Sequence, residues 1–573
     1  MTRRNGLLIL GVLAGSLLLV VVGLGILFSA DGVPDHAVLR LTLRDTFPET
    51  GGNGFLDRLL GWRTPTVLDV VTALDAASDD GRVPAVLLRV PGRVCCGLER
   101  FQEARQAIHR YQAAGGHVTA VLEGGWLPEY YLASAADEVI LLPGQSLDLT
   151  GLVMMVPFLR GTLDLVGVTP QFETTGEHKD APQIYTDREM RPSMRAELAR
   201  LMNALRDEIV AGVAADRGLE PGAVQAWIDR GTLGGAAAVD AGLVDAVAHA
   251  DEARDRLEKS AGTSLTDLDL FDYLGSLRPG WFARPHRIGL VYLSGVILPG
   301  ESSDSEWYDK VAGADTLTRA LEAVRDDDDI AAVVLRIDSP GGSSAASEKI
   351  WRAVTRTRQA KPVIVSVGNY AASGGYYVAV GASDLVALPM SLTGSIGVYA
   401  GKFSMTRLYD WLGLRWGIVK GSENADLYLD VEPWTDDQLS IVRDQVGRIF
   451  DRFQDVVSTG RGIDRETLAP LATGQVWTGN DAVRLSLVDR IGGLHEAIAL
   501  ARERAGLPPD PRVHVQIFPR PRGLLARFSG SSGVGALGPR TALSARDVRQ
   551  LLILDRLSRA GVMAYWPVRL DAR

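Results

Sequence analysis

Ser373 stands in a glycine-rich stretch, Gly368-Asn-Tyr-Ala-Ala-Ser-Gly-Gly-Tyr-Tyr377, that follows an apolar, β-branched run and precedes a segment of small residues. This pattern predicts a buried strand, a sharp turn and a helix. At such a turn a serine hydroxyl can act as a nucleophile, with the Gly374 amide near a helix N-terminus suited to stabilising an oxyanion. A Ser-Gly-Gly tripeptide also permits close helix packing, so the motif alone leaves both roles open.

A second glycine turn, Asp338-Ser-Pro-Gly-Gly342, follows the strand-like run from Val333 to Ile337. Its Gly341 and Gly342 are further candidates for oxyanion donors. Sites in α/β proteins gather outside the carboxyl ends of strands, and we expect both glycine turns to lie there.

A nucleophilic serine needs a base. The eight histidines lie in no recognisable catalytic motif, and only His178 is near a candidate site. A buried lysine can lose its proton at moderate pH, whereas an arginine cannot. Lysine occurs only seven times among the 60 basic residues, and Lys179, in Gly176-Glu-His-Lys-Asp-Ala181, is the only one before Lys259.

The sequence contains an internal repeat, so the elements that position these residues occur twice. Pro84–Val90 matches Ala331–Ile337, and Tyr130–Pro143 matches Tyr376–Pro389, at spacings of 247 and 246 residues. A repeat of this length indicates two copies of one domain, not a solenoid. Apolar strand-like runs alternate with helical stretches such as 347–359, which predicts α/β domains with mainly parallel sheets flanked by helices.

The repeat also shows where the copies differ. Aligning the tyrosine pairs places Leu127 opposite Ser373, and matching the segment around Lys179 with Lys420–Ala425 places Asn424 opposite Lys179. One copy therefore has the lysine without the serine, and the other has the serine without that lysine. A composite site built from both copies explains this pattern. Lys349, Lys402 and Lys420 are among the lysines that lie nearer to the serine in sequence, so spacing alone leaves the base open among these three and Lys179.

The N-terminus carries an uncharged apolar run, residues 7–28, long enough to cross a bilayer. Arg3 and Arg4 precede it and favour a cytoplasmic N-terminus, with the bulk of the chain on the extracytoplasmic side. We interpret it as an uncleaved anchor; a cleaved leader is the alternative. The predicted division is an anchor (1–30), an N-terminal copy (31–275), a linker (276–287), a C-terminal copy (288–518) and a tail (519–573) with a last helix at 545–560.

The composition of the chain argues against several classes of function. The chain has 573 residues, 46% of them hydrophobic, and a formal net charge of −10, which argues against nucleic acid as a partner. Its two cysteines, Cys95 and Cys96, are adjacent and provide neither a disulfide framework nor a metal motif. The acidic run 326–329 has no accompanying ligand loop and is typical of a solvated turn, so no metal site is predicted.

Taken in order, these motifs resemble the long, tandem-domain form of signal peptide peptidase A, or protease IV, over residues 36–515. Beside the two glycine turns, the resemblance rests on Leu392-Thr-Gly-Ser-Ile-Gly397, Val476-Trp-Thr-Gly479 and the segment around Lys179. It implies two crotonase/Clp-protease-like domains and an N-terminal transmembrane helix. It further implies a homotetramer that needs no cofactor and degrades leftover signal peptides at the periplasmic face of the bacterial inner membrane.

The resemblance also implies a role for each matched residue. Ser373 corresponds to the nucleophile, Lys179 to the general base, and Ser395 to a serine that orients the lysine amine. Gly374 and the Gly341/Gly342 turn correspond to the oxyanion hole. Two other functions stay open at this point: a membrane-anchored peptide-binding scaffold without catalysis, and a crotonase-type acyl-CoA enzyme, which rests on fold analogy alone.

Overall fold

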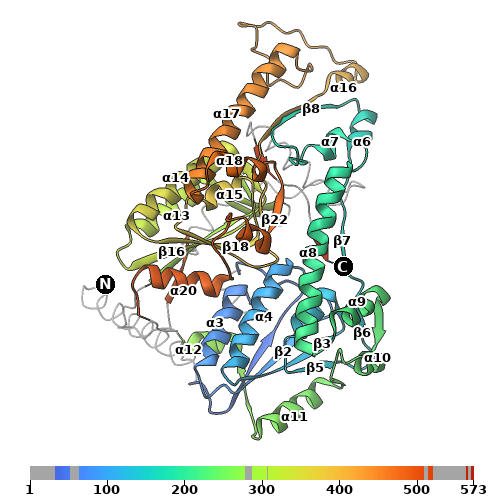
Figure 1. Ribbon diagram of the computed structural model, residues 1–573, viewed down its shortest axis with the longest axis vertical. Helices are drawn as coiled ribbons and strands as arrows, with labels where there is room; N and C mark the ends of the chain where they lie inside the picture. Colours follow the sequence, from blue (N-terminus) through green and yellow to red (C-terminus); the bar gives the residue numbers. More distant parts are fainter. Residues whose placement is uncertain are drawn as a thin grey trace, which may run out of the picture.

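The computed structural model describes residues 32–51, 63–277, 287–305, 308–508, 514–519, 563–565 and 570–572. The predicted anchor, most of the predicted linker and the predicted helix at 545–560 lie outside these residues. Within them, no helix combines the length and the apolar character needed to cross a bilayer. The chain forms two α/β units: an N-terminal unit at the bottom of Figure 1, in blue and green, and a C-terminal unit above it, in yellow and orange.

The N-terminal unit is built on a six-stranded parallel sheet in the order β11-β1-β2-β3-β5-β10. Its strands are β1 (Ala37–Thr42), β2 (Ala85–Pro91), β3 (His117–Glu123), β5 (Glu138–Leu141), β10 (Ala246–Val247) and β11 (Thr266–Asp269), with β4 (Gly125–Trp126), β6 (Ser146–Asp148), β7 (Leu152–Met154) and β9 (Thr232–Gly234) beside them. Its helices are α3 (Val67–Ser78), α4 (Leu98–Ala113), α5 (Leu127–Ala133), α9 (Pro221–Arg230), α10 (Gly235–Asp240), α11 (Ala250–Ala261) and α12 (Leu270–Ser276).

The C-terminal unit repeats the same strand order, β24-β12-β16-β18-β19-β23. Its strands are β12 (Arg287–Ser294), β16 (Ile330–Ser339), β18 (Val363–Ala372), β19 (Asp384–Ala387), β20 (Leu392–Gly394), β22 (Val476–Thr478), β23 (Arg490–Ile491) and β24 (His514–Phe518). Its helices are α13 (Ala314–Asp326), α14 (Ser344–Ala360), α15 (Gly374–Ala379), α16 (Thr406–Trp411), α17 (Asp436–Arg461), α18 (Arg465–Leu468), α19 (Gly479–Arg484) and α20 (Leu494–Arg504). The predicted helix at 347–359 lies inside α14.

Matching hydrogen bonds explain the motifs that occur in both copies. The hydroxyl of Tyr130 donates to the carbonyl of Leu243 at 2.7 Å, and that of Tyr376 donates to the carbonyl of Leu487 at 2.8 Å. Asp245 and Asp489 each accept a backbone amide at the start of the neighbouring strand, both at 2.7 Å. The repeated tyrosine pair and the repeated Leu-Val-Asp therefore fasten equivalent helices and loops to equivalent strands.

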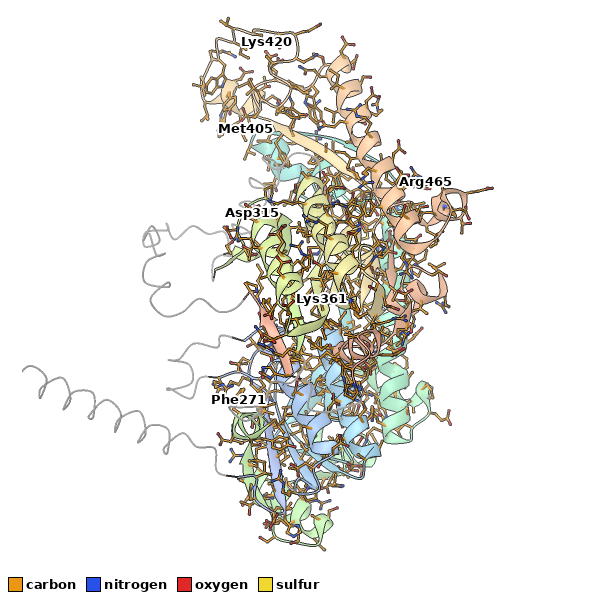
Figure 2. All side chains as sticks on the ribbon, turned by 90° about the vertical axis from the view of Figure 1, so that its left-hand side faces the viewer. Phe271, Asp315, Lys361, Met405, Lys420 and Arg465 are labelled. Carbon is orange, nitrogen blue, oxygen red and sulfur yellow. The ribbon has the colours of Figure 1, made fainter. Side chains whose placement is uncertain are left out.

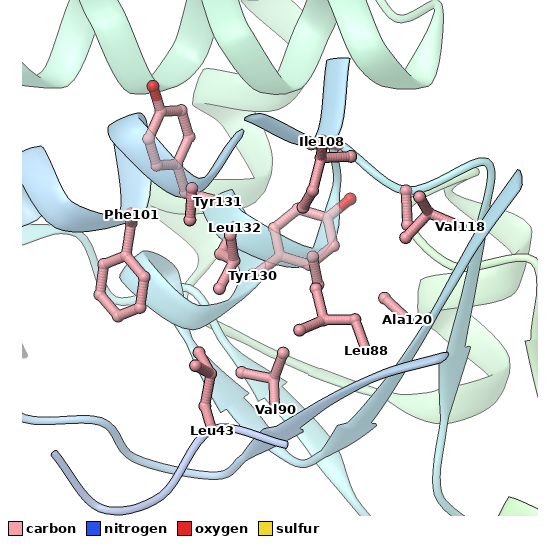
Figure 3. Packing of buried hydrophobic residues seen from close by; sticks show 14 of the residues in the cluster. Leu43, Leu88, Val90, Phe101, Ile108, Val118, Ala120, Tyr130, Tyr131 and Leu132 are labelled. Atoms are coloured by element: carbon pink, nitrogen blue, oxygen red, sulfur yellow. The ribbon is translucent and has the colours of Figure 1, made fainter. Parts of the chain in front are cut away.

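The elongated shape of the molecule is clear from the side, with Phe271 in the lower unit and Lys420 near the upper tip (Figure 2). Each unit has its own apolar core. In the N-terminal unit, side chains of β2 alternate between the two faces of the sheet, as expected for a strand buried on both sides. Leu88 and Val90 pack against Phe101 and Ile108 of α4 (Figure 3), while Leu87 packs with residues of α11 on the other face.

One segment of the N-terminal copy crosses to the C-terminal unit. After β7 the chain forms α6 (Arg160–Leu165), β8 (Thr169–Thr174), α7 (Gln183–Thr186) and the long α8 (Pro192–Arg217), which runs back down to the lower unit (Figure 1). β8 pairs antiparallel with β21 (Tyr399–Ser404). Phe172 of β8 lies across from Gly401, where any β-carbon would clash with the ring. This crossing carries Lys179 into the other unit.

A further sheet joins both copies and the C-terminal segment. Its order is β14-β15-β13-β17-β25-β21-β8, with β13 (Val296–Leu298), β14 (Ser303–Ser305), β15 (Tyr308–Gly313), β17 (Gly341–Ser343) and β25 (Met563–Tyr565). β25 runs antiparallel to β17 and β21, between them. A last strand, β26 (Leu570–Ala572), pairs with β7. Residues close to the C-terminus therefore lie along the second glycine turn.

Candidate active site

Ser373 is fully buried at the junction of β18 and α15, where the sequence predicts a strand-to-helix turn. Its backbone has φ 55° and ψ −115°, a region that residues other than glycine rarely adopt. The amide of Ser373 donates to the carbonyl of Gly394 at 2.8 Å, which fixes the turn against β20. Unusual backbone held by surrounding bonds is typical of functional sites and costs on the order of 1–3 kcal/mol.

Lys179 meets Ser373 across the two units. Its Nζ lies 2.7 Å from Oγ of Ser373, 2.9 Å from Oγ of Ser395 and 3.0 Å from the carbonyl oxygen of Ser395. These three oxygens match the three donors of a protonated amine. After loss of one proton the amine can accept a hydrogen bond, and Ser373 then supplies the donor. The structure therefore brings together one residue of the N-terminal copy, Lys179, and two of the C-terminal copy, Ser373 and Ser395.

Backbone contacts with the C-terminal unit hold the lysine segment. The amide of Thr175 donates to the carbonyl of Val398 at 2.8 Å, and the amide of His178 donates to the carbonyl of Thr473 at 2.7 Å. A β-carbon at Gly474 would lie 2.6 Å from the Lys179 amide nitrogen, and one at Gly397 would lie 3.2 Å from the lysine stem. Glycines at these positions therefore let the segment approach closely enough for Nζ to reach the serines.

Burial controls the protonation of Lys179. Desolvation lowers the pKa of Lys179 to about 7, although the nearby Glu197 carboxylate acts in the opposite direction. Burial also raises the pKa of Glu197 to about 7. Glu197 accepts the amide of Val476 at 2.8 Å, and its other oxygen lies 3.7 Å from Nδ1 of His178. A substantial fraction of Lys179 is consequently neutral near physiological pH.

Two groups of backbone amides lie beside the serine. Gly374 is the first residue of α15, so its N–H has no acceptor within the helix. The second group belongs to residues 338–342, which we call the oxyanion turn. Within it, the Gly341 amide donates to Oγ of Ser339 at 3.2 Å, and both glycines lie opposite β25, Gly341 across from Tyr565 and Gly342 across from Ala564. Because the Gly341 amide already has a side-chain acceptor within the turn, Gly342 is the better candidate donor.

The comparisons with known proteins identify a peptidase family. A model of peptidase family S49 matches residues 114–264 and 355–508. The chain belongs to peptidase family S49. It is 30% identical to Protease 4 of Haemophilus influenzae over 504 residues, covering 85% of this chain and 80% of that protein. It is 28% identical to the chloroplastic serine protease SPPA of Arabidopsis thaliana, covering 81% and 69%, and 30% identical to Protease 4 of Salmonella typhi, covering 77% and 72%.

The chain is accordingly a serine peptidase of the S49 family with two S49 segments in tandem. The two matched segments fall one in each copy, in line with the tandem architecture predicted from the repeat. In the part of the chain that the structure describes, no group of three histidine, cysteine or acidic side chains is arranged to hold a metal ion.

The other lysines named as alternatives lie away from the serine. Lys349 pairs with Asp315 at the surface. Lys402 donates to the carbonyls of Leu427 and Leu429. Lys420 pairs with Asp426 near the upper tip of the molecule (Figure 2). Their Nζ atoms are thus engaged elsewhere, and Lys179 is the lysine that contacts Ser373.

The equivalent place in the N-terminal unit is closed. Leu127 is buried at the start of α5, and Glu129, two residues on, accepts the amide of Val94 at 2.6 Å. Val94 lies in the loop that corresponds to the oxyanion turn. Cys95 and Cys96 of the same loop are free thiols, one exposed and one half-buried. A carboxyl group from inside the protein therefore accepts the amide that corresponds in position to the oxyanion turn.

Sequence reasoning missed Glu197. It is one of four acidic residues in the long helix α8, and no motif distinguishes it from the others. Its role depends on the Val476 amide, 279 residues away, and on the proximity of Lys179. Only the folded chain brings these groups together.

Proposed function

We propose that Ser373 and Lys179 form the catalytic dyad of an endopeptidase, with Ser395 orienting the lysine. The observation that carries the proposal is the 2.7 Å contact between Nζ of Lys179 and Oγ of Ser373 in a buried site. Neutral Lys179 takes the proton of Ser373 as the serine oxygen attacks the carbonyl carbon of a peptide bond. The amides of Gly374 and Gly342 stabilise the negative oxygen of the tetrahedral intermediate.

Collapse of this intermediate breaks the carbon–nitrogen bond of the peptide. Protonated Lys179 gives its proton to the departing amine and becomes neutral again. It then removes a proton from water as the water oxygen attacks the acyl-serine, and the proton returns to Ser373 when the acid leaves. The three oxygens around Nζ keep the amine within reach in both protonation states.

The substrate is an extended peptide. β25 lies antiparallel to β17 and β21 and adjoins the oxyanion turn, which supports a strand-like mode of binding for any peptide that replaces it. An apolar, extended remnant of a signal peptide fits this mode. We therefore propose cleaved signal peptides and similar apolar peptides as substrates, met at the extracytoplasmic face of the bacterial inner membrane, where residues 7–28 anchor the chain.

The chain acts as a homo-oligomer, for which the family resemblance implies four copies. Large apolar side chains are exposed at the tip of the C-terminal unit, among them Trp411 at 75% and Val419 at 99% exposure. The matching segment of the N-terminal copy is β8, which pairs with β21 of the other unit. Among the described residues, the tip of the C-terminal copy has no such partner in its own chain. It therefore suits the surface of a second chain, joined head to tail.

The test is cleavage of a synthetic signal peptide by the full chain in detergent. Ser373→Ala and Lys179→Ala are expected to abolish cleavage, while Lys349→Ala, a matched change at an exposed lysine, is expected to retain it. Circular dichroism checks that each variant is folded. Wild-type protein that binds but does not cleave this and other peptides would overturn the proposal in favour of a silent scaffold. If cleavage is lost in Ser373→Ala but kept in Lys179→Ala, Lys179 is excluded as the base.

A further inference from the structure

Arg100 of the N-terminal unit contacts the start of the oxyanion turn in the other unit. Its Nη2 donates to Oδ2 of Asp338 at 3.0 Å, and its Nη1 donates to the carbonyl of Phe47, also at 3.0 Å. Both side chains of the ion pair are only 16% exposed. The contact involves neither Lys179 nor Ser373, so the N-terminal unit reaches the reaction centre from a second direction.

Besides its ladder with β25, the turn is held by contacts within its own unit. The carbonyl of Asp338 accepts the amide of Gly295 at 2.8 Å. Oγ of Ser339 donates to the Gly295 carbonyl at 2.6 Å and accepts the Gly341 amide. A β-carbon at Gly342 would lie 2.1 Å from the carbonyl oxygen of Ile297. The backbone is thus held on one side by β13 and Gly295, and the Asp338 side chain is held by Arg100.

Arg100 also belongs to a buried charge cluster in which carboxyl groups outnumber guanidinium groups. Its Nε lies 3.2 Å from Glu99 and 3.5 Å from Glu49. The cluster comprises Arg100, Arg336, Glu49, Glu99, Glu103 and Asp338. Buried charges without a partner are strongly unfavourable. Removing Arg100 would leave the Asp338 carboxyl without the cation that contacts it.

The repeat indicates that this ion pair is specific to the active half. Counting from the first residues of α4 and α14, the counterpart of Arg100 is Ala346. Counting from the matched strands β2 and β16, the counterpart of Asp338 is Pro91. The arginine occurs only in the copy that lacks the serine, and the aspartate only in the copy that has it.

We propose that Arg100 is a positioning residue for acyl transfer at Ser373, acting through Asp338 on the amides of the oxyanion turn. The inference rests on the proposed function. The turn must present its amides to a charge that develops only during the reaction, so a small displacement lowers turnover more than substrate binding. An Asp338 carboxylate without its partner would also oppose the developing negative charge.

The experiment compares the full-length wild type with Arg100→Gln, Arg100→Lys and Asp338→Asn. Arg105→Gln is the matched control, because Arg105 lies on the same helix, is buried, and pairs with Asp216 wholly within the N-terminal unit. Signal-peptide cleavage gives kcat and KM, and titration with a fluorophosphonate gives the concentration of reactive Ser373. A peptide aldehyde, which forms a tetrahedral adduct with the serine, reports on the oxyanion site.

For Arg100→Gln, kcat per titrated site is expected to fall on the order of 10- to 100-fold, less than for loss of a direct oxyanion donor. KM should stay within about twofold and the aldehyde should bind more weakly by about the same factor as kcat. Arg100→Lys should recover part of the loss, Asp338→Asn should resemble Arg100→Gln, and Arg105→Gln should match wild type per titrated site.

Unchanged kcat and aldehyde affinity in folded Arg100→Gln would overturn the proposal. A loss that disappears after correction for titrated sites, or that equals the loss in Arg105→Gln, would assign Arg100 a purely structural role and overturn it as well. Should Arg100→Gln fail to fold, Asp338→Asn and Arg100→Lys decide by the same criteria. An inactive wild type would instead mean that the proposed function itself is wrong.

Discussion

The two copies share a scaffold and differ at the place where chemistry occurs. Both fasten the helix after the third strand of the sheet with a tyrosine hydroxyl, Tyr130 in one and Tyr376 in the other. At the start of that helix, one copy has a buried leucine in ordinary helical backbone and the other has Ser373 with a positive φ. The fold therefore does not require the strained serine, which supports a functional reason for it.

The comparison extends to the amides beside the serine. In the N-terminal copy the carboxyl group of Glu129 accepts a hydrogen bond from the amide of Val94. Gly375, the counterpart of Glu129 in the other copy, carries no side chain. The N-terminal copy thus places a buried carboxyl group against this amide, at the position where the C-terminal copy has a glycine. It has kept two other contributions, Lys179 and Arg100, which both reach the active half.

The largest expected effect tests this asymmetry directly. Ser373→Ala should lower kcat/KM by at least about 10⁴-fold, because the nucleophile is lost. Leu127→Ser should not restore activity to Ser373→Ala, since Lys179 lies in the other unit and Glu129 closes the local amide site. Both are measured by signal-peptide cleavage and fluorophosphonate labelling. Labelling of the new serine at position 127 would contradict the view that the N-terminal unit is closed.

The next largest loss of activity is expected for Ser395→Ala. Replacing it with alanine removes one of the three oxygens around Nζ but leaves the carbonyl of residue 395 in place. We expect kcat to fall on the order of 10- to 100-fold, with KM nearly unchanged, because the lysine is less well oriented for proton transfer. Ser391→Ala, a buried serine nearby in sequence that bonds only backbone carbonyls, is the control. Equal losses in the two variants would contradict a specific role for Ser395.

Much of this site could be predicted from residue types and the repeat. Ser373 stands out because its counterpart is leucine, and Lys179 because lysine is rare in a chain that otherwise uses arginine. The fold class follows from alternating strand-like and helical segments. Glu197 and Arg100 could not be found in this way, because charged residues on amphipathic helices usually face solvent. Their burial results from contacts with residues more than 200 positions away.

The pH dependence of activity should reflect the buried lysine. Neutral Lys179 is the active form, so kcat/KM should rise with pH through an ionisation near its pKa of about 7. The Glu197 carboxylate raises the pKa of Lys179 and itself titrates near 7, so the wild-type profile reports both groups. Glu197→Gln removes that negative charge and is expected to move the acidic limb toward lower pH and simplify it to one ionisation.

A matched variant, Glu208→Gln, tests whether any buried acid on α8 has the same effect. Glu208 accepts a hydrogen bond from Gln102 of the N-terminal unit, far along the helix from Lys179. Its profile should follow wild type. A limb that moves toward higher pH in Glu197→Gln, or an equal shift in both variants, would contradict the assignment of Lys179 as the titrating base.

The smallest effect is expected for changes in the scaffold that the two copies share. Tyr130→Phe and Tyr376→Phe each remove one buried hydroxyl that donates to a carbonyl, and each should lower the free energy of unfolding by about 1 kcal/mol. The consequences for activity should differ, because α15 begins directly after Ser373 whereas α5 adjoins the closed site. We expect a measurable fall in kcat only for Tyr376→Phe. Chemical denaturation gives the stability, and peptide cleavage gives the rate. Equal losses of kcat in the two variants would contradict this difference and indicate that removing the hydroxyl from either unit disturbs the active site equally.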